Sequence, residues 1–240
     1  MTTRPRGRTR LFDRWSRSYD DARLQAATYR PIHDAILARL APAIRRAEAS
    51  GRAFRILDLG CGTGQFAARL VTDQAAPDRS TGTTVGRIEV VGLDLSAGML
   101  TRAAARLDGA VGLVRADAQV LPLASGSFDA VACTESFHWY PDQRAALAEC
   151  HRILGPDGQL LVASIATATR TGDALVRSVS TALGQPVRAR PGRALARLFG
   201  DAGFRVIEQQ RIPRRGLVPW PVLTVAARTD GRMATAPATG

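Results

Sequence analysis

Apolar residues in the middle of the chain follow two patterns, short continuous runs and longer runs with helical spacing. Short runs rich in Val, Ile and Leu are typical of buried strands, whereas apolar residues three or four positions apart are typical of amphipathic helices. The strand-like runs lie at 56–59, 88–95, 111–117, 126–134 and, after a Pro/Gly turn, 159–162. Helical runs separate them at about 64–72, 97–107 and 141–154. This alternation predicts an α/β fold whose parallel strands are joined by right-handed crossovers.

The residues before the first strand predict two helices. Phe12, Trp15 and Tyr19 fall on one helical face. Pro31 can open a second helix at its first turn, and apolar residues follow it at every fourth position (Ile32, Ile36, Leu40 and Ile44). Both helices are expected either to cover the carboxyl edge of the sheet or to pack on its face. Packing is the favoured interpretation for Ile36 and Leu40.

Beyond the fifth strand the pattern predicts helices at 173–183 and 193–202, then strands at 204–212 and 222–228. The stretch 73–87 is rich in Gly, Thr, Ser, Pro and charged residues, which is typical of a surface loop.

A glycine-rich turn follows the first strand, in the run from Asp58 through Gly60, Gly62 and Gly64. Glycine permits positive φ and lets a ligand approach the backbone, and the next helix offers unpaired N–H groups. Gly62, Gly64 and Ala67 also satisfy the relaxed dinucleotide pattern G-x-G-x-x-G/A, which is a weak match by itself. A simple connection without a ligand is a third interpretation.

The acid–glycine run of this turn resembles motif I of the class I S-adenosylmethionine (SAM)-dependent methyltransferases. The five strand blocks, in their order over about residues 50–165, resemble the small-molecule enzymes related to ubiquinone and menaquinone biosynthesis. The resemblance implies a Rossmann-like fold with a seven-stranded, mostly parallel sheet, helices on both faces and an antiparallel last strand. It also implies SAM as the cofactor.

The resemblance further implies a role for each matching residue. Gly60, Gly62 and Gly64 would lie against the methionine part of SAM, with Asp58 near its ammonium group. Asp94 and Leu95 would bind the ribose, and Asp117 and Ala118 would bind the adenine. Thr134 and Glu135 would border the transferred methyl group, and Tyr19 would lie near the cofactor. The gap between Gly64 and Asp94 is longer than is usual in the family.

The segment 135–140 after the fourth strand holds the candidate catalytic residue, His138. Imidazole titrates near neutral pH, so His138 could act as a general base. The competing and slightly favoured interpretation is that His138 orients this segment or bonds to backbone. His33 and His151 are expected to be structural, and no histidine has a metal-ligand spacing with acidic residues.

Composition limits the range of partners. The formal net charge is +12, yet every basic residue is Arg and these are spread along the chain, so nucleic acid is not the expected partner. Three cysteines, the lack of a long apolar run and the lack of a signal core favour a cytoplasmic protein without a membrane span. Oligomeric state is not indicated.

The expected organisation is one domain over 12–228, flanked by a basic tail at 1–11 and a flexible tail at 229–240. Within it, 12–50 forms a helical cover, 53–165 the SAM-binding core and 166–228 the substrate side. The leading hypothesis is in-line methyl transfer from SAM to oxygen or carbon of a small molecule. The alternatives are an RNA- or protein-directed methyltransferase, a noncatalytic SAM-binding protein and an NAD-dependent oxidoreductase.

Overall fold

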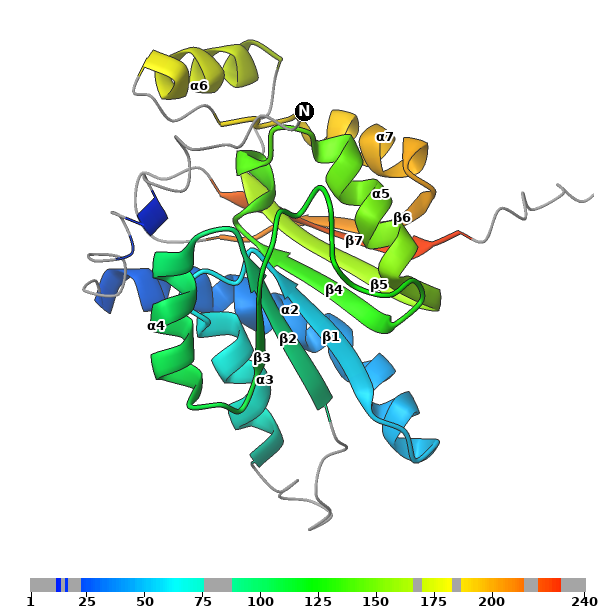
Figure 1. The fold of residues 1–240 in the computed structure, drawn as a ribbon. Coiled ribbons are helices and arrows are strands. Elements are labelled where there is room, and N and C mark those ends of the chain that lie inside the picture. The colour runs from blue at the N-terminus through cyan, green and yellow to red at the C-terminus, as the bar shows by residue number, and fades with distance from the viewer. Residues whose placement is uncertain are drawn as a thin grey trace, which may run out of the picture.

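A computed structural model describes residues 12–13, 16, 23–75, 88–165, 170–182, 187–213 and 220–229. These residues contain a seven-stranded sheet of order β3-β2-β1-β4-β5-β7-β6 (Figure 1). Its strands are β1 Phe54–Leu59, β2 Ile88–Asp94, β3 Gly112–Arg115, β4 Phe128–Thr134, β5 Leu154–Ile165, β6 Phe204–Arg211 and β7 Pro221–Arg228. The first five strands are parallel, and β7 pairs antiparallel with both β5 and β6. The predicted sheet, including its antiparallel last strand, is confirmed.

Helices cover both faces of this sheet. They are α2 Arg23–Ala49, α3 Gln65–Ala75 and α4 Ala97–Leu107 on one face, and α5 Gln143–Ile153 and α7 Gly192–Asp201 on the other. α6 Arg170–Ala182 lies apart from the sheet (Figure 1), and a 3₁₀ turn, η1, spans Phe137–Trp139. Side chains of a strand point alternately to opposite faces. Ile56 therefore packs with α2, α3 and α4, while Leu57 packs with α5 and α7. The predicted alternation of strands and helices, with helices packed on both faces of the sheet, is confirmed.

The start of α2 differs from the prediction. The helix begins at Arg23, so Pro31 lies inside it and does not open it. A proline inside a helix lacks the N–H for one backbone bond and costs about 3 kcal/mol. The burial of Ile32, Ile36 and Leu40 against the sheet favours the helix in spite of this cost. α2 therefore packs on a face of the sheet, and the packing predicted for Ile36 and Leu40 is confirmed.

Two further boundaries shift. α3 extends to Ala75, so residues 73–75 of the expected loop are helical, and 76–87 lie outside the described residues. β5 begins at Leu154, before the expected Pro/Gly turn. Leu154 already pairs with Phe128 of β4, and the next pair, Gln159 with Ala130, follows after a shift in register. The turn is therefore an irregularity inside the strand. Trp15, Tyr19 and the predicted tail at 1–11 also lie outside the described residues. The same holds for 230–240 of the predicted tail at 229–240, whereas Thr229 is described and donates its N–H to the Gly203 carbonyl at 2.9 Å.

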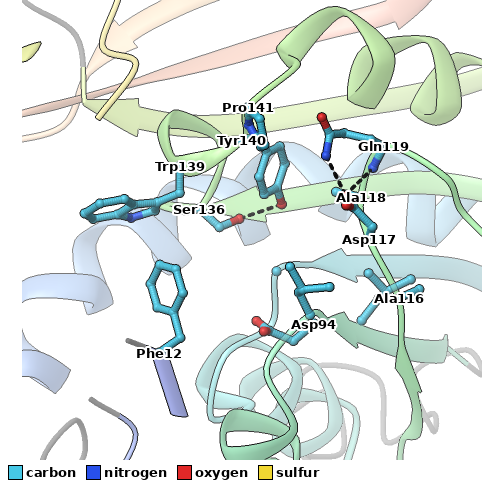
Figure 2. A pocket seen from close by; sticks show the side chains of 13 residues that line it. Phe12, Asp94, Ala116, Asp117, Ala118, Gln119, Ser136, Trp139, Tyr140 and Pro141 are labelled. Carbon is cyan, nitrogen blue, oxygen red and sulfur yellow. Dashed lines mark hydrogen bonds between the residues drawn. The ribbon is translucent and has the colours of Figure 1, made fainter. Parts of the chain in front are cut away.

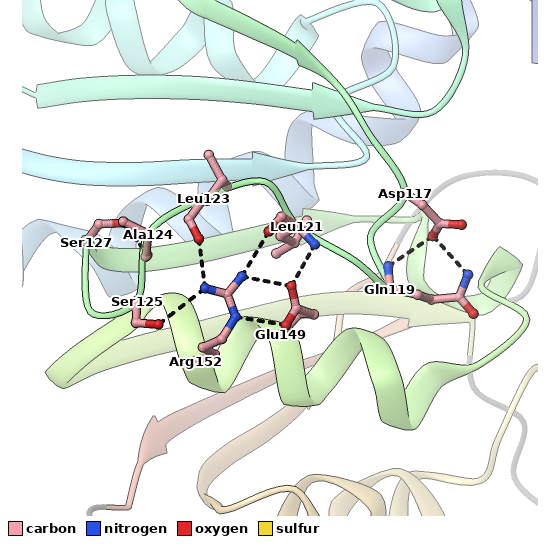
Figure 3. A network of polar contacts seen from close by, with 9 residues as sticks. All are labelled: Asp117, Gln119, Leu121, Leu123, Ala124, Ser125, Ser127, Glu149 and Arg152. Carbon is pink, nitrogen blue, oxygen red and sulfur yellow. Dashed lines mark hydrogen bonds and ion pairs between the residues drawn. The ribbon is translucent and has the colours of Figure 1, made fainter. Parts of the chain in front are cut away.

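The segment between β3 and β4 is held by a partly buried polar network around Arg152 and Glu149 (Figure 3). Arg152 of α5 donates to the carbonyl oxygens of Leu121 (2.9 Å) and Leu123 (2.7 Å) and to the Glu149 carboxylate. Glu149 in turn accepts the Leu121 N–H at 2.6 Å. The hydrogen bonds from Arg152 lower the pKa of Glu149. This network fixes the segment that carries Asp117.

Within the described ranges, no helix combines the length and the apolar character that a membrane span requires.

Replacement of Arg152 by Met should lower the free energy of unfolding by about 1.5–3 kcal/mol, because it removes charge-assisted bonds to two backbone carbonyls. The control is Arg144→Met, since Arg144 pairs with Asp201 at 2.9 Å where both side chains are more than half exposed. Such an exposed pair contributes less than about 1 kcal/mol. Urea denaturation of the two variants measures both changes, and equal changes would contradict the role given to Arg152.

Candidate functional site

A cleft opens at the carboxyl ends of β1, β2 and β4 (Figure 2). It encloses about 670 Å³ of empty space, open solvent at its mouth included. Five of its lining residues are predicted site residues: Gly60, Asp94, Leu95, Asp117 and Ala118. We call it the carboxyl-end cleft. The parallel strands bring together residues that are far apart in the sequence, as expected for a ligand site in an open α/β sheet.

Asp94, the last residue of β2, connects the cleft to the glycine turn. Its Oδ2 accepts the Gly62 N–H at 3.0 Å, and its Oδ1 accepts the Ser96 N–H at 2.8 Å. Burial raises the pKa of Asp94, while these backbone bonds act in the opposite direction. An ionised carboxylate has about four acceptor positions, so each oxygen can still accept a hydroxyl group. Asp94 is therefore a fixed acceptor pair that opens on the cleft.

The glycine turn has the left-handed backbone that its sequence requires. Gly60, Gly62 and Gly64 have φ of 72°, 54° and 77°. A Cβ on Gly60 would lie 2.2 Å from the Ser136 Oγ, and one on Gly64 would lie 2.9 Å from a Leu107 methyl carbon. Gly62 has open space beside it, so only its φ restricts the residue type there.

A second, smaller pocket lies on the other side of this turn, with about 320 Å³ of empty space. Gly62 and Thr134 line it among the predicted residues, and Gly60 lines both this pocket and the carboxyl-end cleft. Three aromatic rings close its far wall, those of Tyr29, His33 and Phe66. We call it the loop pocket.

Asp58 lies beneath the glycine turn and lines neither cavity. It is fully buried, and neither carboxylate oxygen has a hydrogen-bond partner within normal geometry among the described residues. Burial raises the pKa of Asp58 to about 7; the backbone N–H of Ala67 opposes this, and the charge of Asp94 adds to it. A buried carboxylate without a partner is costly, so a cation bound above the turn would be favoured there.

Asp117 and Ala118 lie at the opposite end of the cleft, beyond β3. Oδ1 of Asp117 accepts both the backbone N–H of Gln119 at 2.9 Å and its side-chain amide at 2.8 Å (Figures 2 and 3). Both bonds use Oδ1, so Oδ2 of Asp117 takes part in neither of them and can accept an amino group from a ligand.

Glu135, the residue directly after β4, has a strained backbone. Its φ is 58°, a left-handed value that costs a residue with a side chain about 1–2 kcal/mol. Its N–H donates to the Ala163 carbonyl at 2.9 Å. Strain of this kind is common at functional sites. Here it turns the chain from Thr134, at the loop pocket, towards the carboxyl-end cleft at Ser136.

His138 is enclosed and lines neither cavity. Its side chain is 2% exposed, and Nδ1 lies 3.4 Å from the Ser164 Oγ. Its carbonyl accepts the Arg188 N–H at 2.7 Å. Its role as a general base stays a prediction, and Tyr19 lies outside the described residues.

Several cleft residues have no assigned role in the sequence prediction: Phe12, Leu93, Ala116, Gln119, Ser136, Trp139, Tyr140 and Pro141. Ser136 and Tyr140 form the tightest group, with their hydroxyl oxygens 2.9 Å apart and Ser136 donating to the Leu59 carbonyl at 3.0 Å. The rings of Phe12 and Trp139 meet edge to face at 5.6 Å. Four of these eight share one signal in the sequence, because Ser136, Trp139, Tyr140 and Pro141 all follow β4 closely.

The donor groups fit SAM better than a metal ion. The cleft offers a paired acceptor for hydroxyl groups at Asp94 and apolar walls at Leu95 and Ala118, and the buried acid Asp58 lies outside the cleft, beneath the turn. In the part of the chain described by the structure, no three His, Cys, Asp or Glu residues are grouped as metal ligands.

Comparisons with known proteins agree with this chemistry. A family model described as "Methyltransferase domain" matches residues 57–162. The chain is 38% identical over 117 residues to malonyl-[acyl-carrier protein] O-methyltransferase of Methylococcus capsulatus, covering 48% of this chain and 38% of the relative. It is 38% identical over 111 residues to demethylmenaquinone methyltransferase of Thermus thermophilus, covering 45% of this chain and 46% of the relative. The matches therefore span less than half the length of these two relatives.

A longer match reaches O-methyltransferase rstn1 of Aspergillus nomiae, with 32% identity over 170 residues, 71% of this chain and 72% of the relative. Among solved structures, 1,6-didemethyltoxoflavin-N1-methyltransferase of Burkholderia thailandensis superposes with a TM-score of 0.65 and 22% identity, covering 96% and 92% of the two chains. A SAM-dependent methyltransferase of Thermotoga maritima superposes with a TM-score of 0.65 and 20% identity, covering 92% of this chain and 99% of the other. These two likenesses show the shared fold.

With its sheet order, its acid–glycine turn and a 32% identical relative matched over most of its length, the chain belongs to the class I SAM-dependent methyltransferases.

Proposed function

We propose that this protein is an enzyme that transfers a methyl group from SAM to oxygen or carbon of a small molecule. The observation that carries the proposal is the Asp94 carboxylate, held by the Gly62 and Ser96 N–H groups at the mouth of the carboxyl-end cleft. Its remaining acceptor positions suit the two ribose hydroxyls of SAM.

The rest of the cleft suits the other parts of SAM. Leu95 and Ala118 offer apolar surface to the adenine ring, and Asp117 can accept its amino group. The backbone of the glycine turn would lie against the methionine part. The unpaired carboxylate of Asp58 beneath the turn would favour the ammonium group through its charge.

The loop pocket suits the methyl acceptor, because it meets the carboxyl-end cleft at Gly60 and also contains Thr134. Bound SAM supplies an activated methyl group, whose transfer in line to the acceptor leaves the bonding electron pair on sulfur. The chain's own contribution is to hold the two reactants at near-attack distance, which can lower a barrier by roughly 7–11 kcal/mol in favourable cases. The aromatic wall of the pocket also excludes water.

Oxygen is the favoured acceptor atom. Two of the relatives with longer matches are named O-methyltransferases, at 32% and 34% identity. The demethylmenaquinone enzyme keeps methylation at other atoms as the alternative.

Asp94→Asn should weaken SAM binding by about 10–100-fold, because an amide in this position loses an acceptor and faces a backbone N–H with its own NH₂ group. Isothermal titration measures the affinity. Asp201→Asn is the control, since Asp201 pairs only at the exposed surface with Arg144. Unchanged affinity in Asp94→Asn, or binding of NADH in place of SAM, would refute the assignment.

SAM binding should depend on pH through Asp58. With its pKa raised to about 7, the free protein holds a proton on Asp58 at pH 6, and a bound cation should lower that pKa and release the proton. Affinity should therefore rise between pH 5 and pH 7 by up to about tenfold per pH unit, then level off. Titrations in buffers of different ionisation enthalpy count the released protons. Asp58→Asn should abolish this release, and an identical release in the variant would exclude Asp58 as its source.

His138→Ala separates the two roles considered for His138. A general base would leave SAM affinity intact and lower turnover by a factor of about 10²–10⁴. Because the imidazole is 2% exposed and faces Ser164, we expect the other result, a loss of stability with turnover per folded molecule nearly unchanged. Single-turnover rates and thermal melts measured together decide between them.

A further inference from the structure

A basic groove adjoins the loop pocket on the sheet face that α2, α3 and α4 cover. It holds about 880 Å³ of empty space, open solvent included. Among its lining residues are three arginines, Arg30, Arg69 and Arg106, together with His33, Gln65 and Thr72. The arginines come from three different helices, so the cluster is produced by the fold and not by a local run of basic residues. We call it the basic groove.

The charge of this groove is positive on balance. Arg69 pairs with Asp34 at 2.7 Å, and the Asp34 side chain is 57% exposed. Arg30 is exposed, and Arg106 donates through Nε to the Thr63 carbonyl at 2.9 Å. None of the described residues that line the groove is acidic. Among the described residues, three guanidinium groups line the groove and one carboxylate, that of Asp34, lies at its margin.

His33 forms the wall between the groove and the loop pocket. It is 4% exposed and packs against the rings of Tyr29 and Phe66 at centroid distances of 6.3 and 5.2 Å. Burial lowers its pKa to about 4, and the positive charge of Arg69 acts in the same direction. The imidazole is therefore neutral at pH 7, and the positive potential of the arginines extends to this wall.

The three cavities form a continuous series. His33 and Gln65 line both the basic groove and the loop pocket, and Gly60 lines both the loop pocket and the carboxyl-end cleft. Acidic groups lie at one end, at Asp94 and Asp117, and arginines at the other. The cationic donor suits the acidic end. A molecule that reaches the methyl group through the loop pocket would meet positive charge on its other side.

We propose that the basic groove binds an anionic group of the methyl acceptor, a carboxylate or a phosphate, while the reacting atom lies in the loop pocket. This proposal rests on the proposed function for the position of the methyl group. Guanidinium groups bind both anions through paired N–H donors, and the binding is stronger where side chains exclude part of the solvent.

The test uses inorganic phosphate and malonate as probes, titrated into the full chain saturated with S-adenosylhomocysteine. Arginine Nε–Hε signals in ¹H–¹⁵N NMR spectra follow the binding at constant ionic strength, because salt screens weak surface contacts. We expect saturable binding that Arg30→Gln together with Arg69→Gln weakens about tenfold or more. Arg205→Gln together with Arg211→Gln is the matched control for the double variant, and Arg205→Gln is the control for Arg30→Gln, since they remove the same number of charges from exposed positions of β6. If the double variant does not fold, Arg30→Gln alone should weaken binding about threefold.

A preference for phosphate or for malonate identifies which anion the acceptor carries. The proposal is overturned if neither probe saturates, if the β6 controls weaken binding as much as the groove variants do, or if only RNA competes for the groove. SAM affinity is measured on the same variants in separate samples without S-adenosylhomocysteine. Loss of SAM binding with phosphate binding retained would contradict the proposed function alone, and the reverse result would contradict the groove alone.

Discussion

The contact between the glycine turn of β1 and the end of β2 is the constraint on which this site depends. The N–H groups of Gly60 and Cys61 both donate to the Leu93 carbonyl, at 2.7 and 3.0 Å, and the Gly62 N–H donates to Asp94. Three consecutive amides thus bind the tip of the neighbouring strand, which requires a backbone that only glycine adopts freely. The same contact fixes the Asp94 carboxylate and forms the floor between the carboxyl-end cleft and the loop pocket.

Around this contact the charges are separated along the site. Buried or bonded carboxylates, Asp58, Asp94 and Asp117, lie on the side where a cationic donor would bind. The arginines of the basic groove lie on the side of the proposed acceptor. A bound cation would offset the negative potential on one side of the turn, and a bound anion would offset the positive potential on the other side. Electrostatics therefore favours the ternary complex over a complex with either ligand alone.

Much of the fold was predictable because its signals are local. Apolar runs located the strands, and the structure brings Asp94, at the end of β2, and Asp117, just beyond β3, to the same cleft. Their roles in binding the ribose and the adenine stay predictions. The course of α2 through Pro31 was not predictable, since its stability comes from distant packing. Ser136 and Tyr140 were likewise found only when the fold placed them against Leu59, and the basic groove only when three helices brought Arg30, Arg69 and Arg106 together.

A crystal structure with S-adenosylhomocysteine soaked or co-crystallised tests the central claim most directly. The account predicts density in the carboxyl-end cleft, with both ribose hydroxyls within hydrogen-bond distance of Asp94 and the amino acid portion against Gly60, where the cleft meets the loop pocket. Density at another place, or a ribose that makes no contact with Asp94 at full occupancy, would contradict it.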